Sequence, residues 1–594
     1  MTMLKRNILL VATALAGFHV AQAATVPADT VYRNGYIYTV DARDSVQQAL
    51  AVKGGRIAYV GSDDGVGAYI SKRTKVVDLK GRMMMPGLVD GHMHPLAGGA
   101  QLLRCNLNYL PLTVPEFQAR IQACLDKDGA QAADKPLVVV NWFQQDMRPA
   151  GTEATHATLD ALKTRRAILV LSSFGHSTLA NSRALQLAGI DRTTKDPVAG
   201  RINRDAAGDA TGVLEDSAQE LVAKLTPEPT ARENAAAAKA ALGALREQGV
   251  TSFLDAAADD AALRAFGTLQ KQGGLTARAH FALLLPPAQA SDPDKAVAAL
   301  AAKARRYDQG PVRVAPTVAV RHAKLFMDGV IAAPALTGTM LKPYNVNQGS
   351  NTDPHWVAGT SKGPDVYFPQ ESLRAILSGL AKHGITPHIH VDGDGAVHET
   401  LDAIAYLRTT EYGRDVRPAL AHNELVAPDD MPRFAELNAT PVLSFQWEKP
   451  APDTLSGLQG YLEPARYDII EPAGYLEQAH ARIAYGSDWP VDPLNEWFAL
   501  KVGVTRTNSP EAGPQFAGKL GTDPGLSRAT VLRAITFNAA YTLGQEKELG
   551  SLEAGKLADM IVLDKNFMTV ESEDIAQIKV VQTVVGGRLV YNRE

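Results

Sequence analysis

The chain has 594 residues, of which 45% are hydrophobic and 21% are charged, as in soluble globular proteins with more than one domain. Its formal net charge of -4 lacks the basic excess of nucleic-acid-binding proteins, and no run of like charges predicts an interaction tail. We therefore expect a small-molecule substrate and no nucleic-acid partner.

The amino terminus has the pattern of a cleaved signal peptide. Lys5 and Arg6 precede an apolar run over residues 8–16, and Ala21 and Ala23 place small side chains at the cleavage positions. We expect cleavage after Ala23, with residues 1–23 removed, and export to the periplasm or the cell exterior. The apolar run is too short to span a bilayer and no later run reaches about 18 apolar residues, so we expect no stable membrane anchor.

Both ends of the mature chain are predicted to be rich in strands. The short strand-like runs separated by turns are residues 31–38, 49–61, 555–564 and 578–591. Asn34–Gly35 and Gly54–Gly55 are dipeptides typical of hairpin turns. We expect one small β-sandwich domain, formed by residues 24–84 and 546–594.

The middle of the chain, residues 85–545, alternates strand-like and helix-like segments. The eight strand-like runs are the one that ends at His94 and residues 249–255, 277–285, 320–327, 384–390, 419–422, 441–445 and 482–488. Eight parallel strands that alternate with helices close into a TIM barrel, and an open doubly wound sheet is the alternative. About 150 residues separate His94 from the next run, so we expect an insertion over the barrel mouth at about residues 97–229.

Two histidines one residue apart, His92 and His94, end the first of these runs. Side chains at i and i+2 of a strand share a face, so both rings can bind one cation, although two surface histidines in a turn would give the same tripeptide. Three later runs also end in a candidate ligand before a turn, at His390, His422 and Asp488. Because barrel chemistry lies at strand ends, their recurrence favours the metal site.

The only two cysteines are Cys105 and Cys124. In an oxidising compartment they can form a disulfide, and two free buried thiols are the alternative. Their spacing fits no metal-binding or redox motif.

The chain resembles the amidohydrolase superfamily, most closely its amidohydrolase 3 family, which includes N-substituted formamide deformylase-like proteins. The resemblance covers nearly the whole mature chain. Its motifs, in the family's order, are P-G-L-V-D-G-H-M-H (86–94), K-L-F-M-D-G (324–329), H-V-D-G-D-G-A-V (390–397), A-H-N-E-L-V-A-P-D-D (421–430) and Y-G-S-D-W-P-V (485–491). The family fold is a distorted TIM barrel with a small β-sandwich from both chain ends.

The resemblance implies a set of metal ligands: His92, His94, His390, His422, Asp488 and, as a bridging ligand after carboxylation, Lys324. Only a neutral amine adds carbon dioxide, so Lys324 needs a lowered pKa to form a carbamate. With the N6-carboxylysine two ions share the site; without it, one ion binds and Lys324 is structural. Zn²⁺ is the expected metal, and the same ligands also suit Mn²⁺, Fe²⁺ and Co²⁺.

The activity that the resemblance implies is hydrolysis of a carbon–nitrogen bond other than a peptide bond, in an N-acyl, N-formyl or cyclic amide. A metal-activated hydroxide attacks the carbonyl, and Asp488 shuttles the proton to the leaving nitrogen. Ester or lactone hydrolysis is an alternative, and an inactive barrel that serves as a binding protein is another. The resemblance also favours a homodimer.

Further residues are expected around this site. By resemblance His176 faces the substrate and polarises its carbonyl, although a buried structural histidine fits equally. The other expected substrate-binding residues are Trp142, Gln446, Trp447 and Trp489. His388 is expected to support or pack beside the ligands. Asp392 and Asp394 can each support a ligand histidine by a hydrogen bond, and a loop aspartate that faces solvent is the alternative. The family usually carries an apolar residue at the position of Asp392.

Overall fold

The computed structural model describes residues 26–129, 135–149, 151–173, 175, 177–197, 200–333, 335–350 and 353–593. The predicted signal peptide and His176 lie outside these residues. Among the described residues, no helix has the length and apolar character needed to cross a membrane.

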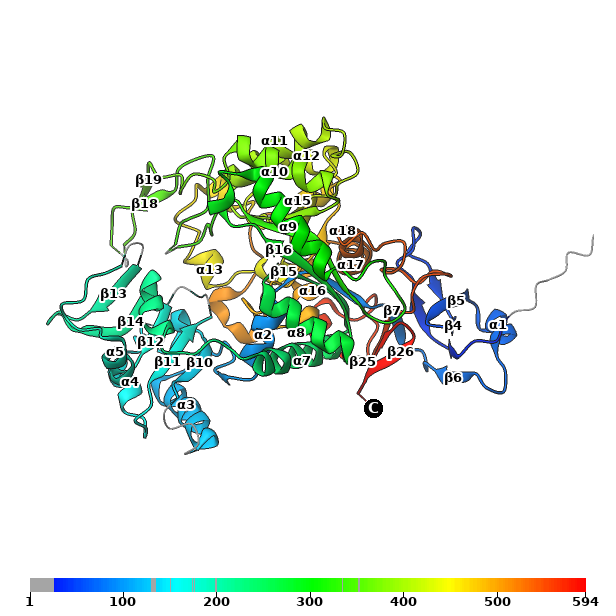
Figure 1. Ribbon diagram of the computed structural model, residues 1–594, viewed down its shortest axis with the longest axis horizontal. Coiled ribbons are helices and arrows are strands. Elements are labelled where there is room, and N and C mark those ends of the chain that lie inside the picture. The colour runs from blue at the N-terminus through cyan, green and yellow to red at the C-terminus, as the bar shows by residue number, and fades with distance from the viewer. Residues whose placement is uncertain are drawn as a thin grey trace, which may run out of the picture.

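An eight-stranded parallel sheet forms the centre of the described chain (Figure 1). Its strands are β8 (Leu88–Met93), β15 (Val250–Ala258), β16 (Arg278–Leu284), β17 (Val318–Phe326), β20 (Thr386–Val391), β21 (Ala419–His422), β22 (Thr440–Leu443) and β23 (Ala484–Tyr485). Each strand pairs in parallel with the next in this order. All eight coincide with a predicted run, so the TIM barrel is confirmed and the open doubly wound sheet is wrong.

The seam between β8 and β23 is closed by single backbone hydrogen bonds rather than by a regular ladder. The amide of Asp488 donates to the carbonyl of His92, and that of His94 donates to the carbonyl of Trp489, both at 2.7 Å. A Cβ atom on Gly486 would lie 2.4 Å from the Cβ of His92, so the close approach at the seam requires glycine. The barrel therefore closes at the predicted metal ligands themselves.

Helices cover the outside of the barrel (Figure 1). The longer ones are α7 (Ala231–Gln248), α8 (Asp260–Lys271), α9 (Pro293–Tyr307), α10 (Gln370–Lys382), α11 (Asp394–Arg408) and α16 (Glu496–Thr505). A capping box starts α7: the Thr230 hydroxyl accepts the Glu233 amide, and the Glu233 carboxylate accepts the Thr230 amide. Their apolar faces bury a continuous core against the strands, which removes a large apolar area from water.

Both chain ends form a pair of sheets beside the barrel. The strands of the first sheet are β5 (Arg56–Gly61), β4 (Ala49–Lys53), β1 (Thr30–Arg33) and β6 (Lys75–Asp78), and those of the second are β26 (Arg588–Asn592), β25 (Val580–Val585), β24 (Met560–Leu563), β7 (Met83–Pro86), β2 (Tyr36–Tyr38) and β3 (Val46–Gln47). Gly54–Gly55 joins the antiparallel pair β4 and β5 as a hairpin turn. Asn34–Gly35 does not form the expected hairpin, because β1 and β2 belong to different sheets.

Several connections fix this β-domain to the barrel, among them a covalent one and a buried ion pair. Strand β7 runs directly into β8, the strand that carries His92. Arg278, at the start of β16, forms a buried two-point ion pair with Asp559, with nitrogen–oxygen distances of 2.6 and 3.0 Å. Two parallel contacts hold the guanidinium in one orientation, so the β-domain packs on the barrel in a defined way.

The insertion has its own sheet and its own core. The strands, in sheet order, are β13 (Gly200–Arg204), β14 (Ala210–Asp216), β12 (Ser177–Ala180), β11 (Ile168–Ser172), β10 (Leu137–Trp142) and β9 (Cys105–Asn106). The helices are α3 (Val114–Asp128), α4 (His156–Asp160), α5 (Ser182–Ala188) and α6 (Glu220–Ala223). In Figure 1 the insertion lies on the side of the barrel opposite to the β-domain.

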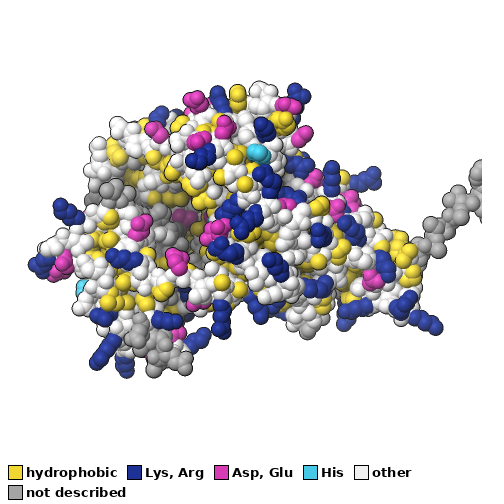
Figure 2. Space-filling view, viewed as in Figure 1, with side chains coloured by type: hydrophobic (Ala, Val, Ile, Leu, Met, Phe, Trp, Pro, Cys, Tyr) yellow, Lys and Arg dark blue, Asp and Glu magenta, His cyan; other side chains and the backbone are white. Residues whose placement is uncertain are grey.

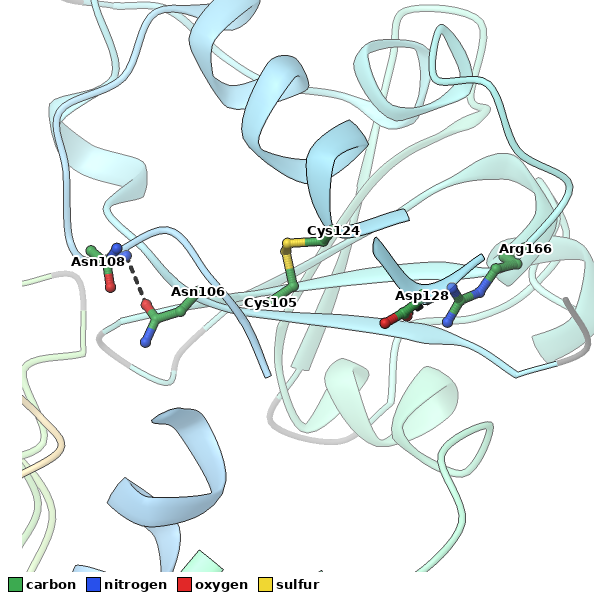
Figure 3. The surroundings of a disulfide bond; sticks show 6 residues. All are labelled: Cys105, Asn106, Asn108, Cys124, Asp128 and Arg166. Atoms are coloured by element: carbon green, nitrogen blue, oxygen red, sulfur yellow. Dashed lines mark hydrogen bonds and ion pairs between the residues drawn. A yellow bond between two sulfur atoms is a disulfide. The ribbon is translucent and has the colours of Figure 1, made fainter. Parts of the chain in front are cut away.

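A disulfide between Cys105 and Cys124 ties β9 to α3 (Figure 3). Of the two alternatives left by the sequence, the structure therefore has the paired cysteines. Beside it, the Arg166 guanidinium forms an ion pair with Asp128 at 2.9 Å, near the end of α3. Cross-linking residues 105 and 124 restricts the unfolded insertion and stabilises its sheet edge.

Candidate metal centre

The predicted ligands lie together at the carboxyl ends of the barrel strands. His92 is on β8, Lys324 on β17, His390 on β20 and His422 at the end of β21, while Asp488 follows β23. All five side chains are buried, and that of Lys324 is fully inaccessible to solvent. Because side chains alternate along a strand, these strands direct several polar groups at one interior space.

The first group of donors consists of His92, His94 and Asp488. Oδ1 of Asp488 lies 3.1 Å from Nε2 of His94 and 3.4 Å from Nε2 of His92, yet no group in the described part of the chain donates a hydrogen bond to it. Two ligands of one tetrahedral Zn²⁺ lie about 3.4 Å apart, from bond lengths near 2.1 Å. The spacing therefore fits ligand atoms that converge on one ion. His422 lies close to this group, because the ligand atoms of His92, His422 and Asp488 are all within 4.8 Å of one another.

The backbone is strained at two of these ligands. His422 has φ of 78° and Asp488 has φ of 52°, both in the left-handed region that favours glycine. The neighbour Asn423 also has a positive φ, of 59°. Such conformations persist where the surrounding structure imposes them, and here they turn the ends of β21 and β23 toward the barrel interior.

His388 fixes the orientation of the His92 ring. Nε2 of His388 lies 2.8 Å from Nδ1 of His92. With the proton on Nδ1, His92 donates to His388 and keeps the lone pair of its Nε2 for a metal ion. The same Nε2 is 3.4 Å from Nζ of Lys324 and faces Asp488, so the ring points its free nitrogen into the donor group.

The imidazoles of the centre are held in the neutral form that binds metals. Burial, together with the charge of Lys324, lowers the pKa of His92 well below its ordinary value. Burial lowers the pKa of His422 in the same way, with His390 and Lys324 contributing. The pKa of His390 falls to about 3, again mainly by burial. At neutral pH these rings compete weakly for protons, which favours metal binding.

Lys324 is also shifted toward its neutral form. Burial lowers the pKa of its amine to about 8, although Asp488 and Asp392 act in the opposite direction. Nζ lies 4.5 Å from the centre of the Phe326 ring, which replaces part of the lost solvent contact. Carbamate formation requires a neutral amine. With a pKa of about 8, part of the Lys324 amine is neutral near physiological pH.

A second group of donors consists of His390, Asp392 and His422, whose ligand atoms lie within 4.8 Å of one another. Nε2 of His390 donates to the carbonyl of Gly329 at 2.9 Å, so its Nδ1 keeps a free lone pair. Oδ1 of Asp392 is buried and has no hydrogen-bond partner among the residues that the structure describes. The ring of His422 also lies near that of His92, with centroid distances of 4.7 Å to His92 and 4.5 Å to His390, and His422 groups with His92 and Asp488 as well.

Of the residues expected to contact substrate, two lie beside the ligands. The indole of Trp447 stacks on His422, with centroids 5.4 Å apart, and its Nε1 donates to Asp492 at 2.8 Å. Gln446 is buried, and its Nε2 donates to the carbonyl of Ser487, next to Asp488.

The structure places the other aromatic candidates elsewhere. Trp142 is 2% exposed and packs against Phe117 in the core of the insertion, so it is not at an open substrate surface. Trp489 packs on Gly98 of α2 (Pro95–Leu102), and it lines a pocket of about 280 Å³ together with residues of α2, α7 and the insertion. The remaining candidate, His176, lies outside the described residues.

Two aspartates of the family motifs have structural roles that the sequence did not reveal. Asp90 accepts the backbone amides of both His92 and Ser487 through Oδ1, at 3.0 and 3.1 Å, and so bridges the barrel seam. Asp328 accepts the amides of Asp392 and Gly393, which links the ends of β17 and β20. In the sequence, the sign that these two aspartates matter is their position in the first two family motifs, residues 86–94 and 324–329.

For Asp394 the sequence left two alternatives, support of a ligand histidine or a place facing solvent, and the buried carboxylate does neither. Its carboxylate forms an ion pair with Arg466 at 2.7 Å and accepts the amide of Leu341 at 2.8 Å. These contacts satisfy both oxygens, so Asp394 holds the loop before β18 (Asn345–Asn347) rather than a ligand.

The donors present fit a divalent ion. Neutral imidazoles and carboxylates are the usual ligands of Zn²⁺ and related metals, and buried oxygens of Asp488 and Asp392 accept no hydrogen bond within the described residues. Figure 2 shows the surface hollowed between the insertion and the barrel, with acidic side chains at the margin of the hollow.

The fold and these donors together define an α/β-barrel protein with a candidate metal centre at its strand ends. Residues 75–591 match the amidohydrolase family, and the chain belongs to that family. It is 24% identical to N-substituted formamide deformylase of Arthrobacter pascens, over 95% of this chain and 98% of that protein. It is 25% identical to the putative amidohydrolase YtcJ of Bacillus subtilis, over 95% and 99%.

A crystal structure of an uncharacterized metal-dependent hydrolase from Pyrococcus horikoshii aligns with 91% of this chain and 99% of its own, with a TM-score of 0.69 and 20% identity. This similarity shows a shared fold.

Replacing His388 tests its role in orienting His92. We expect His388→Ala to weaken Zn²⁺ binding about 10–100-fold, as losses of such supporting hydrogen bonds do, and His388→Gln to recover part of it, because its side-chain oxygen can accept from Nδ1 of His92. Competition with a chelating dye measures the affinity. His398→Ala, on α11, is the matched control; unchanged affinity in His388→Ala would contradict the assignment.

Proposed function

We propose that the protein is a metal-dependent hydrolase that cleaves a carbon–nitrogen bond, other than a peptide bond, in a small N-acyl, N-formyl or cyclic amide. The observation that carries the proposal is the convergence of His92, His94 and Asp488 at the barrel seam. Oδ1 of Asp488 lies near both Nε2 atoms and accepts no hydrogen bond from the described residues. Membership of the amidohydrolase family supports the reaction class.

His92, His94, His390, His422 and Asp488 would hold the metal. A bound divalent ion supplies Lewis-acid chemistry, since it lowers the pKa of water and polarises a carbonyl. The chain supplies the rest: the carboxylate of Asp488 orients the attacking water, accepts its proton and returns it to the leaving nitrogen. The buried surroundings strengthen these electrostatic contacts, because little water screens them.

The substrate would be bound by groups beside the ligands. We assign Trp447 to one wall of the site, because its indole is fixed by Asp492 and stacks on His422. Gln446 is held next to Asp488, and its buried Oε1, which has no partner within the described ranges, can accept from an amide N–H. We retain His176 as the residue proposed to polarise the carbonyl.

We also propose that the enzyme is exported. The amino-terminal pattern of Lys5, Arg6 and the apolar run supports a signal peptide. The disulfide between Cys105 and Cys124 agrees with a periplasmic or secreted location, because such bonds persist in oxidising compartments.

Asp488→Asn tests the proton shuttle. We expect at least a 10²–10⁴-fold loss of hydrolysis with an intact fold, because an amide cannot accept the proton from water. The assay is a panel of N-acyl amino acids, formamides, hydantoins and lactones, with unfolding and metal content followed in parallel. Asp308→Asn, which alters an ion pair on the amino-terminal side of β17, is the control.

An active Asp488→Asn enzyme would contradict the shuttle. Hydrolysis of lactones alone would contradict the carbon–nitrogen assignment, and a metal-loaded protein that hydrolyses no member of the panel would favour the binding-protein alternative.

Carboxylation of Lys324 is tested by its pH dependence. The shifted pKa of about 8 means that raising the pH from 7 to 9 converts the amine to the neutral form that adds carbon dioxide. At constant dissolved ¹³CO₂ we expect a carbamate signal in the ¹³C NMR spectrum that grows over this range and is missing from Lys324→Met. A signal that is absent from the native protein, or that Lys324→Met retains, would contradict carboxylation.

A further inference from the structure

One apolar side chain at the mouth of the barrel is far more exposed than its neighbours. Leu284, the last residue of β16, is 43% exposed, whereas Leu283 and Leu285 are 2% and 1% exposed. Side chains alternate along a strand, and Leu283 and Leu285 belong to the core between the strands and the outer helices. Leu284 therefore points the other way, into the barrel, and its exposed surface faces the space at the strand ends.

The pairing of the strands supports this direction. Leu284 pairs with Lys324 of β17 in the parallel register. Paired residues of neighbouring strands direct their side chains to the same face, and Lys324 faces the metal centre, with Nζ 3.4 Å from Nε2 of His92. Leu284 thus lies on the inner face of the barrel, at the level of the candidate centre.

Phe326 continues this apolar side of the mouth. It lies two residues after Lys324 on the same face of β17, is only partly buried, and has its ring centroid 5.0 Å from that of His390. We call Leu284 and Phe326 the β16–β17 wall. Because the side chain of Lys324 is fully inaccessible, the wall presents apolar groups, and not the amine, to a molecule at the centre.

The β16–β17 wall lies across the barrel from the groups proposed to handle the substrate nitrogen. In the sheet order, β16 is four positions from β22, and β17 is four positions from β23. Four positions are half of an eight-stranded barrel. Gln446 follows β22, and Asp488, which returns the proton to the leaving nitrogen, follows β23. The two bonds from a planar amide carbon to nitrogen and to the acyl group diverge, so the acyl group is directed at the wall.

We propose that Leu284 and Phe326 bind the acyl group of the substrate, and that this group is an alkyl or aryl chain. The inference rests on the proposed function and selects N-acyl over N-formyl compounds among its substrates. A formyl group carries only hydrogen on the carbonyl carbon and would leave the wall in contact with water. An apolar chain covers the wall and removes apolar surface of both partners from water, which stabilises the complex.

Binding of n-alkyl hydroxamates to the zinc-loaded protein tests the wall without turnover. The hydroxamate oxygens bind a divalent ion, and the chain on the carbonyl carbon takes the direction of the acyl group. Isothermal titration calorimetry measures Kd for aceto-, butyro- and hexanohydroxamate. We expect Kd to fall about fourfold per added methylene in the native protein, and by less than about twofold in Leu284→Asn, which replaces the apolar surface by an amide.

Three further variants are controls for this experiment. Leu589 on β26 is also 43% exposed but lies in the β-domain, so Leu589→Asn should keep the native dependence on chain length. Leu284→Met retains an apolar surface of similar size and should keep it as well. Leu284→Ala adds no polar group and should weaken the dependence, which serves if Leu284→Asn does not fold.

Hydrolysis assigns the chain to the acyl side of the bond. With butylamine as the constant leaving group, kcat/KM should rise from the N-formyl through the N-acetyl to the N-hexanoyl compound, and Leu284→Asn should flatten the rise. With acetyl held constant and the amine lengthened, Leu284→Asn should change kcat/KM by the same factor for every amine.

Several results would overturn the assignment of the wall: a Kd that does not depend on chain length in the native protein, a dependence that Leu284→Asn and Leu284→Ala retain, or one that Leu589→Asn loses. Faster hydrolysis of the N-formyl than of the N-hexanoyl compound would overturn it too and leave the proposed function standing. Binding of hydroxamates with the expected dependence, by a protein that hydrolyses no amide, would support the wall and contradict the proposed function.

Discussion

The closure of the barrel between β8 and β23 is the constraint on which the site depends. Asp90 accepts amides from both sides of the seam, while the amides of Asp488 and His94 cross it to the carbonyls of His92 and Trp489. These bonds join the first and last strands within the residues that carry the ligand side chains. Any change that opens the seam would separate His92 and His94 from Asp488, so barrel closure and metal binding are physically coupled.

The second requirement is a set of buried groups that stay in the right protonation state. Burial lowers the pKa of His92, His390 and His422, and a buried Lys324 adds to the effect at each. Burial, together with the like charges of Glu424 and Asp328, raises the pKa of the Asp392 carboxyl well above its ordinary value. The shifts of the histidines favour the neutral imidazoles that bind a divalent ion.

The sequence predicted the barrel well, because its apolar runs coincide with the eight strands and four of the runs end in a candidate ligand, at His94, His390, His422 and Asp488. His92, Lys324, His390, His422 and Asp488 could be named for the same reason, aided by the order of the motifs. Contacts between residues far apart in the sequence were harder to predict. The rings of His388 and His92 are hydrogen-bonded although the two residues are 296 positions apart, and no local pattern encodes such a contact. Likewise, Asn34–Gly35 indicates a turn but not which strands pair, and Trp142 carries no signal that separates a core indole from a pocket wall.

The most direct test of the account is a crystal structure of the zinc-loaded protein with anomalous data collected at the zinc edge. The account predicts a strong anomalous peak bonded to Nε2 of His92, Nε2 of His94 and the Asp488 carboxylate, at distances of about 2.0–2.2 Å. Well-ordered side chains at this place with no peak among them, or zinc bound only at the protein surface, would contradict it.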